Sequence, residues 1–208
     1  MSEENQSEQN QAPESNESSQ DAAASQAAVT ADGYISHVKD VLTSPDEHFA
    51  DDSKASRNYG LISAGAFLGL IFLFNVVSQV TRFTSWRFEF GFLTSSIKVV
   101  LAIGLPIVAT VFVLRWLEGR SGTARSMDFY IGRFGAMLIL PALMLLVGIP
   151  LNLLDIALQG WFYGVALILT YISVFMLSYL YAAQGKLQTA VLMAVGFYFA
   201  YRLLRLLF

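Results

Sequence analysis

The sequence from Tyr59 to Val80, YGLISAGAFLGLIFLFNVVSQV, contains no charged residue and is long enough, as a helix, to cross a hydrocarbon core of about 30 Å. A helix on a soluble protein shows a polar face with a period of about 3.6 residues, and this stretch shows none. Gly65 and Gly69 stand in a GxxxG spacing, which is typical of closely packed membrane helices. The stretch therefore predicts a transmembrane helix, whose two glycines pack against another helix of the same chain or against a second copy in a homo-oligomer.

The composition of the whole chain also indicates a membrane protein. Of its 208 residues, 55% are hydrophobic and only 14% are charged, and the mean hydropathy is +0.52. The formal net charge of −3 averages an acidic N-terminal part and a different remainder, so it says little about partners. We find no basic patch in the sequence and expect no nucleic-acid partner. Cysteine is absent, which excludes disulfides, thiolate metal sites and cysteine nucleophiles.

Residues 1–32 differ from the rest of the chain. They are rich in Ser, Gln, Asn, Glu and Ala, and they contain no aromatic residue, lysine or arginine. Such a segment cannot bury enough apolar surface to offset its ordering entropy, so we predict a disordered acidic tail. The tail either keeps the protein soluble or serves a specific recognition. The basic and apolar regions of a signal peptide are both missing.

The following segment, 33–57, predicts two short amphipathic helices. Apolar residues recur at helical spacing up to Leu42. Ser44 stands at an N-cap position, Pro45 follows at the first helical position, and Glu47 completes a capping box with Ser44. We expect both helices to lie along the membrane face with their apolar sides down, or to bind a partner. The alternative is a plain spacer between tail and membrane.

The rest of the chain, 58–208, predicts an all-α, polytopic helical membrane bundle of about five transmembrane helices. The expected spans are 59–80, 95–117, 136–156, 161–182 and 188–207. The first connection, 81–92, alternates aromatic rings with Arg, Glu and Gly, and we expect an interfacial loop there. The fifth span is the least typical, because Arg202 and Arg205 fall in its last turns.

Prolines and a few polar side chains interrupt the spans. Pro106 should kink the second span, and Pro141 and Pro150 lie in the third. The uncharged polar residues inside spans are expected to hydrogen-bond neighbouring helices rather than to carry substrates. They are Asn75, Gln79, Thr110, Asn152, Thr170 and Ser173.

Lysine and arginine are biased toward one side of this topology, and that bias sets the orientation of a membrane protein. With the N-terminus inside, the inner segments hold the larger share: Lys39, Lys54, Arg57, Arg115, Arg120, Arg125, Arg133 and Lys186. The outer segments hold Arg82, Arg87, Lys98, Arg202 and Arg205. We therefore expect a cytoplasmic N-terminus and a C-terminus on the opposite side of the membrane.

The same topology places three ionisable residues at a similar depth near the outer side. Charges in a bilayer are costly and are usually paired or functional. Our hypothesis is an intramembrane ion pair between Lys98 and Asp155, with Arg202 competing for the carboxylate. The alternative is that each side chain extends separately to water.

No pattern of catalytic residues is found. The chain contains no HExxH, no GxSxG and no Walker loop, and no histidine lies in the membrane part to activate a serine. A carboxylate pair for acid–base chemistry is missing as well. We predict no catalytic, metal-binding or cofactor-binding residues, no cofactor and no enzyme activity.

The run VKDVLTSPDEHF, followed by a polar stretch and closely spaced spans, resembles the Yip family of small membrane proteins (Ypt/Rab-GTPase-interacting-protein-like), in its bacterial branch. Members begin the shared region with a helix ending in Leu-x-x-Pro-x-x-x-Phe on the cytoplasmic side, here Leu42, Pro45 and Phe49. The resemblance covers about residues 34–208. The DLYGP-type signature of the eukaryotic branch does not occur, which argues against GTPase binding.

The resemblance implies a non-enzymatic integral membrane protein that works through other proteins or lipids. We therefore expect an adaptor or organising subunit, in a bacterial cytoplasmic membrane, whose partners are membrane lipids and other membrane proteins. The alternative is a transporter or channel subunit with a solute path between the proline-bearing second and third spans.

Overall fold

A computed structural model gives the fold of the chain. It describes residues 31–82, 91–120, 122, 125–154, 158–182 and 185–208. The chain divides into two compact units, Met1–Lys39 and Asp40–Phe208. Residues 31–43 are helical and cross the boundary between the units. Ala31 and Asp32, which we assigned to the tail, are thus helical, and the rest of the predicted tail lies outside the described residues.

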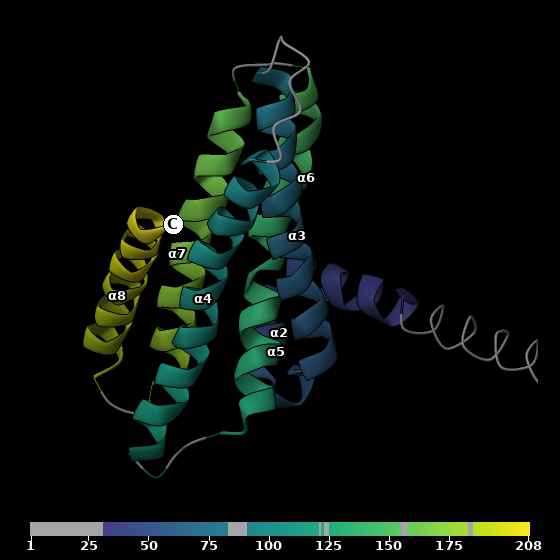
Figure 1. Cartoon of the computed structure of the whole chain (residues 1–208). Helices are drawn as coiled ribbons and strands as arrows, with labels where there is room; N and C mark the ends of the chain where they lie inside the picture. The colour runs from purple at the N-terminus through teal and green to yellow at the C-terminus, as the bar shows by residue number, and fades with distance from the viewer. Residues whose placement is uncertain (1–30, 83–90, 121, 123–124, 155–157, 183–184) are drawn as a thin grey trace, which may run out of the picture. The chain divides into compact units, whose positions relative to one another are not determined.

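The second unit is a helical bundle in which α3, α5–α6 and α8 run in one direction and α4 and α7 in the other (Figure 1). Its elements are α2 (Pro45–Ala50), η1 (Asp52–Lys54), α3 (Arg57–Arg82), α4 (Gly91–Arg120), α5 (Met127–Met137), α6 (Ile139–Leu153), α7 (Gln159–Tyr181) and α8 (Lys186–Leu207). α3 packs on α4, α5 and α6, α7 packs on α6, and α8 packs on α4 and α7.

Five helical segments are long and apolar enough to cross a membrane: Arg57–Val80, Gly91–Arg120, Met127–Leu153, Gln159–Tyr181 and Lys186–Leu207. The predicted fold class is confirmed, and the chain is a multi-pass integral membrane protein. In the described residues, large apolar side chains also cover the outside of the bundle, among them Val108, Ile168 and Leu192. Such a surface is stable in lipid, which solvates apolar side chains as well as a protein core does.

The second and third spans differ most from the predicted bounds. α4 begins at Gly91 and ends at Arg120, so it is longer at both ends than 95–117. The third span begins at Met127 rather than at 136, because the polar residues of its first turns are accommodated by neighbouring protein. This shift places Arg133 inside a helix, although the sequence pattern indicated a loop. Most of the predicted aromatic loop, 83–90, lies outside the described residues.

The third span is divided into α5 and α6 at Leu138, and Pro141 explains the division. Proline has no N–H, so the carbonyl four residues earlier, that of Met137, loses its helical donor. The hydroxyl of Ser173 in α7 shares its proton between this carbonyl, at 3.0 Å, and the Leu169 carbonyl of its own helix, at 2.9 Å. A side chain of the neighbouring helix thereby satisfies a group that lipid could not satisfy.

Other polar residues of the spans divide into two groups. Gln79 of α3 donates to the hydroxyl of Ser96 at 3.2 Å, and Asn152 of α6 donates to the carbonyl of Phe74 at 3.1 Å. Together with Ser173, these residues confirm the expected cross-helix bonds. Asn75 donates to the Ile71 carbonyl of its own helix and is also hydrogen-bonded to Tyr163 of α7. Thr110 and Thr170 donate to carbonyls of their own helices instead.

A close backbone contact joins Gly60 of α3 to Gly132 and Gly135 of α5. A Cβ atom on Gly60 would lie 2.6 Å from the Cα of Gly132, and one on Gly135 would overlap the backbone of Gly60. By contrast, no described atom lies within 4 Å of a Cβ on Gly65 or Gly69. The expected packing of Gly65 and Gly69 inside the bundle is therefore not found, and the alternative of a second copy stays a prediction.

The start of α2 agrees with the prediction in position but not in detail. Ser44 is the N-cap residue and Pro45 occupies the first turn. The side chain of Ser44 makes no capping hydrogen bond, so the predicted capping box with Glu47 is wrong. The reason lies in the backbone, because the N–H of Ser44 still donates to the carbonyl of Asp40 at 3.0 Å and continues the preceding helix.

We predict that Gly135→Ala destabilises the bundle by about 1–3 kcal/mol, because its methyl group overlaps backbone that can move only with a whole helix. Gly65→Ala adds the same methyl group where nothing stands within 4 Å and should leave the melting temperature in detergent unchanged. Equal melting temperatures for the two variants would contradict the close contact between α3 and α5.

A second prediction concerns Ser173 and Pro141. Ser173→Ala should cost about 0.6 kcal/mol, the average for a hydrogen bond between membrane helices. In a Pro141→Ala background the new N–H of residue 141 can reach the Met137 carbonyl, so Ser173→Ala should then cost less. Unfolding free energies of the four proteins form a double-mutant cycle, and a coupling energy of zero would refute this account.

Candidate functional site

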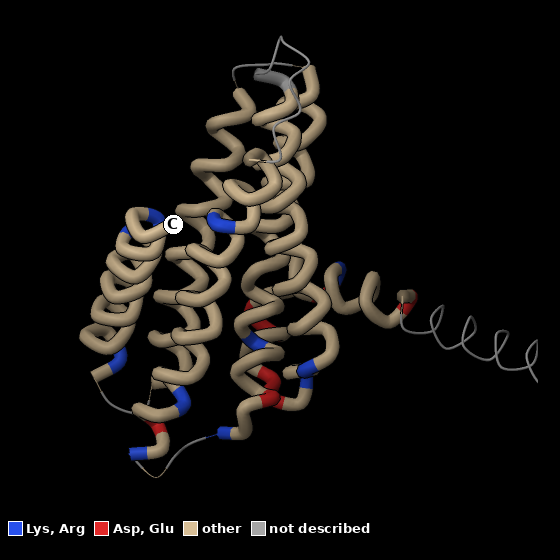
Figure 2. Tube along the Cα trace, viewed as in Figure 1, with Lys and Arg blue, Asp and Glu red and all other residues tan. Residues whose placement is uncertain are grey.

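Most charged residues of the described bundle lie at the end where α3 and α5 begin (Figure 2). At its centre is Arg133 of α5, whose side chain is 0% exposed and is the largest fully buried side chain in the described part of the chain. A buried guanidinium is stable only if its charge and its donors are satisfied by protein groups. The partners of Arg133 therefore identify the segment that this end of the bundle binds.

Arg133 holds the segment between α2 and η1 through that segment's backbone. Its Nη1 donates to the carbonyl of His48 at 2.6 Å, and its Nη2 donates to the carbonyl of Asp51. The same Nη2 lies 3.8 Å from Oδ1 of Asp52. The guanidinium thus links α5 to a segment far earlier in the chain. Arg133 and His48 are 85 residues apart in the sequence.

Aromatic rings and a second arginine surround this contact. The Cζ atom of Arg133 lies 5.4 Å from the ring centroid of Phe129 and 5.8 Å from that of Phe49. The Cζ atom of Arg125 lies 4.9 Å from the Phe129 ring and 5.3 Å from the Tyr181 ring. The hydroxyl of Tyr181 donates to the carbonyl of Phe49 at 3.3 Å, so α7 also contacts this segment.

The carboxylate of Asp52 joins the two arginines. Its Oδ2 lies 3.4 Å from Nε of Arg125, while its Oδ1 faces Arg133. The Asp52 side chain is 56% exposed, so solvent screens both ion pairs and each contributes about 0–1 kcal/mol. Hydrogen bonds from a charged donor to buried carbonyls contribute about 1.5–3 kcal/mol each. The backbone contacts of Arg133 therefore dominate.

We call this group the arginine junction. Its members are Arg133, Arg125, Asp52, Phe49 and Tyr181.

Asp51, whose carbonyl accepts a hydrogen bond from Arg133, is also the N-cap residue of η1. The carboxylate of Asp51 accepts hydrogen bonds from the Ser53 hydroxyl at 2.6 Å and from the Ser53 N–H at 3.0 Å. These bonds favour the charged form, and the side-chain bond is the larger cause, so the pKa of Asp51 is lowered. The stabilisation is present above the pKa of the unfolded chain and is lost as the pH falls through the lowered pKa.

A buried pair of side chains beside the junction connects α4 with α5. The hydroxyl of Tyr130 donates to Oε2 of Glu118, and both side chains are almost fully buried, with Glu118 only 2% exposed. The backbone N–H of Arg125 donates to the same hydroxyl at 3.4 Å. The carboxylate of Glu118 therefore faces the interior of the bundle and not its surface.

The structure separates the three residues of the predicted partner motif. Leu42 is 43% exposed and Pro45 is exposed, whereas Phe49 is half-buried and belongs to the arginine junction. Phe49 thus attaches α2 to the bundle, and Leu42 and Pro45 remain on the surface. The prediction named all three as interface residues, and their role toward a partner stays a prediction.

The predicted ion pair has one partner outside the described residues, namely Asp155. Lys98 lies near the start of α4, and no described carboxylate lies within ion-pair distance of it. The Nε atom of Arg202 donates to the hydroxyl of Tyr198 at 3.2 Å, one helical turn away. The pairing of Lys98 with Asp155 stays a prediction.

Sequence reasoning missed the importance of Arg133 and Asp52. An arginine between Gly132 and Gly135 gave a signal, because glycines allow another backbone to come close enough to reach the guanidinium. The partners could not be found from sequence, because two of them are backbone carbonyls and carry no residue-specific pattern.

The contacts of this site attach α2 and η1 to the bundle. Its acceptors are carbonyls and one carboxylate held by arginines, and no group of three or more His, Cys, Asp or Glu side chains that could hold a metal ion occurs among the described residues. Comparisons with protein-family models, curated proteins and solved structures found no match for this chain.

We predict that Arg133→Lys loosens α2 and η1, because one ammonium group cannot reproduce two planar N–H contacts to the His48 and Asp51 carbonyls. Losing one bond of about 1.5–3 kcal/mol should raise amide hydrogen exchange of residues 45–54 by about tenfold or more. Hydrogen exchange of the protein in detergent, read by mass spectrometry, measures this effect.

Two further variants serve as controls for that experiment. Asp52→Asn removes only the screened ion pairs and should change the rate of amide hydrogen exchange of residues 45–54 by a few-fold at most. Tyr181→Phe removes one weaker bond and tests the same attachment if Arg133→Lys fails to fold. If Asp52→Asn loosened the segment as much as Arg133→Lys, the carbonyl contacts would not be the dominant link.

Proposed function

We propose that this chain is a non-enzymatic adaptor or organising subunit of the bacterial cytoplasmic membrane, related to the Yip family, and that its N-terminal segment presents a binding surface in the cytoplasm. The observation that carries the proposal is the arginine junction. A buried arginine and a tyrosine attach α2 to the bundle through α2's own backbone and through Phe49.

This attachment leaves the outer side of α2 and the end of the preceding helix, 31–43, accessible. Leu42 is exposed, and so are Pro45, Asp46 and Glu47 in the first turn of α2. A short helix held at one end of a membrane bundle presents these side chains in a defined geometry, which lowers the entropy lost on binding. An enzyme would need polar groups that converge on a substrate, whereas here they converge on the protein's own backbone.

The distribution of charge supports the proposed orientation. Arg57, Arg125 and Arg133 lie at the end of the bundle that carries α2, and the positive-inside rule favours the cytoplasm for that end. With five spans, the C-terminus then lies on the opposite side.

The proposal is tested by in-cell crosslinking followed by purification of the chain and identification of its partners. Leu42→Asp adds a charge to the proposed surface and should remove at least one specific partner. Ala50→Asp adds the same charge at another exposed position of the same segment and should retain the full partner set. A partner set that is unchanged by Leu42→Asp would overturn the role of this surface.

A flux assay separates the adaptor from the alternative of a transporter or channel subunit. The purified chain is reconstituted into vesicles and solute uptake is measured. We expect no uptake above protein-free vesicles. Solute-dependent uptake that is abolished by Asp155→Asn would replace the adaptor with the transporter.

A further inference from the structure

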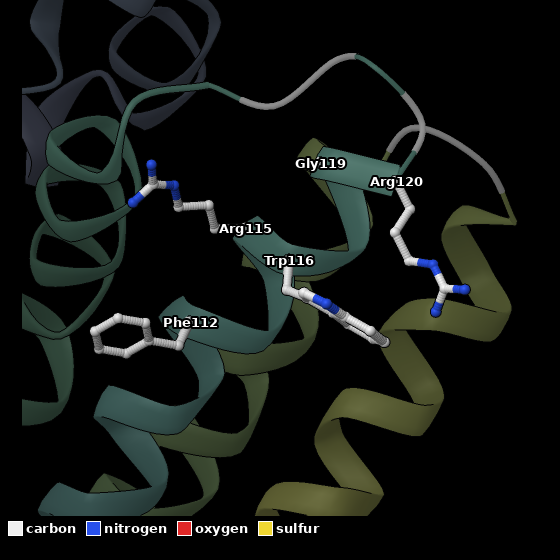
Figure 3. Close-up of a pocket in the computed structure, with 5 residues that line it drawn as sticks. All are labelled: Phe112, Arg115, Trp116, Gly119 and Arg120. Carbon is white, nitrogen blue, oxygen red and sulfur yellow. The ribbon is translucent and has the colours of Figure 1, made fainter.

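The end of α4 carries a second group of charged and aromatic residues, on the outside of the bundle. Phe112, Arg115, Trp116, Gly119 and Arg120 line a hollow of about 440 Å³ (Figure 3). At about 100° per residue these positions share one side of the helix, with Arg115 at one edge and Arg120 at the other. Figure 3 shows the two arginines extending to opposite sides, with Gly119 between them.

The depth of this hollow follows from the length of α4. Its 30 residues extend over about 45 Å, so a hydrocarbon core of about 30 Å cannot cover both ends. The last turns therefore lie at the level of the lipid headgroups. Phe112 and Trp116 are 58% and 57% exposed, and Trp is the residue that prefers this level.

The two arginines of the hollow differ from the other arginines at this end. Arg57 and Arg125 have carboxylate partners at 3.4 Å, and buried Arg133 faces Asp52. Within the described part of the chain, no carboxylate lies within ion-pair distance of Arg115 or Arg120. This side of α4 thus has positive charge that no carboxylate of the described residues balances.

Nearby groups leave this charge available to a ligand. The Cζ atom of Arg120 lies over the ring of Trp116, 4.8 Å from its centroid, and within the described part of the chain no hydrogen bond uses the N–H groups of Arg120, which can serve an acceptor. Glu118, the nearest acid along the helix, is buried against Tyr130 and cannot neutralise it. Gly119 has no side chain and leaves open space between the arginines.

We propose that this hollow binds the phosphate of an anionic phospholipid. The phosphate lies over Gly119, and the side chains of Arg115 and Arg120 turn toward it from the two edges of the hollow and donate hydrogen bonds to it. Trp116 and Phe112 contact the glycerol and the upper acyl chain. A lipid is the occupant that fits, because the charged part of the hollow lies at headgroup level and its apolar part continues toward the hydrocarbon. This inference goes beyond the adaptor proposal and rests only on the membrane-spanning fold.

The test uses the full chain, delipidated in neutral detergent and incubated with phosphatidylglycerol or with phosphatidylcholine. Native mass spectrometry then measures the lipid retained by each protein. We expect the wild type to prefer phosphatidylglycerol and the double variant Arg115→Gln with Arg120→Gln to bind it at least tenfold more weakly, since each arginine at a lipid surface contributes about 1 kcal/mol. Trp116→Leu should weaken binding by a smaller factor.

A matched control removes the same charge elsewhere at this end of the bundle. Lys54→Gln with Arg57→Gln should retain phosphatidylglycerol as the wild type does. Equal loss in both double variants would mean that net charge alone attracts the lipid, and unchanged binding by the Arg115 and Arg120 variant would remove the site. Each single arginine variant is measured as well, so that a misfolded double variant does not end the test.

A last arm separates a lipid from free phosphate. Inorganic phosphate is added at the concentration of phosphatidylglycerol that half-saturates the wild type. We expect the lipid to remain bound, because phosphate lacks the glycerol and acyl contacts with Trp116 and Phe112. Complete displacement of phosphatidylglycerol by phosphate would overturn the proposal of a lipid site and indicate a site for free phosphate.

Discussion

The close approach of two backbones, α3 at Gly60 and α5 at Gly132 and Gly135, is the constraint on which this end of the molecule depends. Side chains at these positions would separate the helices, and Arg133 stands between two of the glycines. Only because α5 lies so near to the start of α3 can this guanidinium reach the carbonyls of His48 and Asp51. The same glycines thus allow α3 and α5 to pack closely and Arg133 to reach α2.

The two ends of the bundle are held by different chemistry. Away from the arginine junction, uncharged amides link neighbouring helices, with Asn152 bonded to α3 and Gln79 to α4. Lipid gives helices no hydrophobic reason to associate, so these few bonds and the packing of small residues specify which helices are neighbours. Most charged groups of the described bundle lie at the end of the arginine junction, where water and headgroups can solvate them.

At that end, the positive charges fall into two classes. Arg133 and Arg125 face acceptors of the protein, and they hold α2 in place. Arg115 and Arg120 face outward on α4 beside exposed aromatic rings. The proposed adaptor would need both properties, because it would present a surface to a partner and hold a defined position against the lipid. The two groups of arginines lie on separate elements, so each proposal can be tested alone.

The sequence by itself determined the class of fold, the five spans and the start of α2. These features follow from local properties: apolar runs of sufficient length, a proline at the first position of a helix, and a paucity of charge. It also indicated that polar residues in spans bond to neighbours, which holds for Gln79, Asn152 and Ser173. It assigned Arg133 to a loop, because an arginine next to an apolar run favours a span boundary.

Only the tertiary structure decided which glycines pack and which arginines are paired. Gly65 and Gly69 have the spacing that favours close packing, yet Gly60, Gly132 and Gly135 make the contact, because packing depends on which face meets another helix. The partners of Arg133 are carbonyls, which every residue possesses, so no sequence pattern distinguishes them. Phe49 attaches α2 to the bundle and Leu42 stays outside because α5 and α7 meet only one side of that segment.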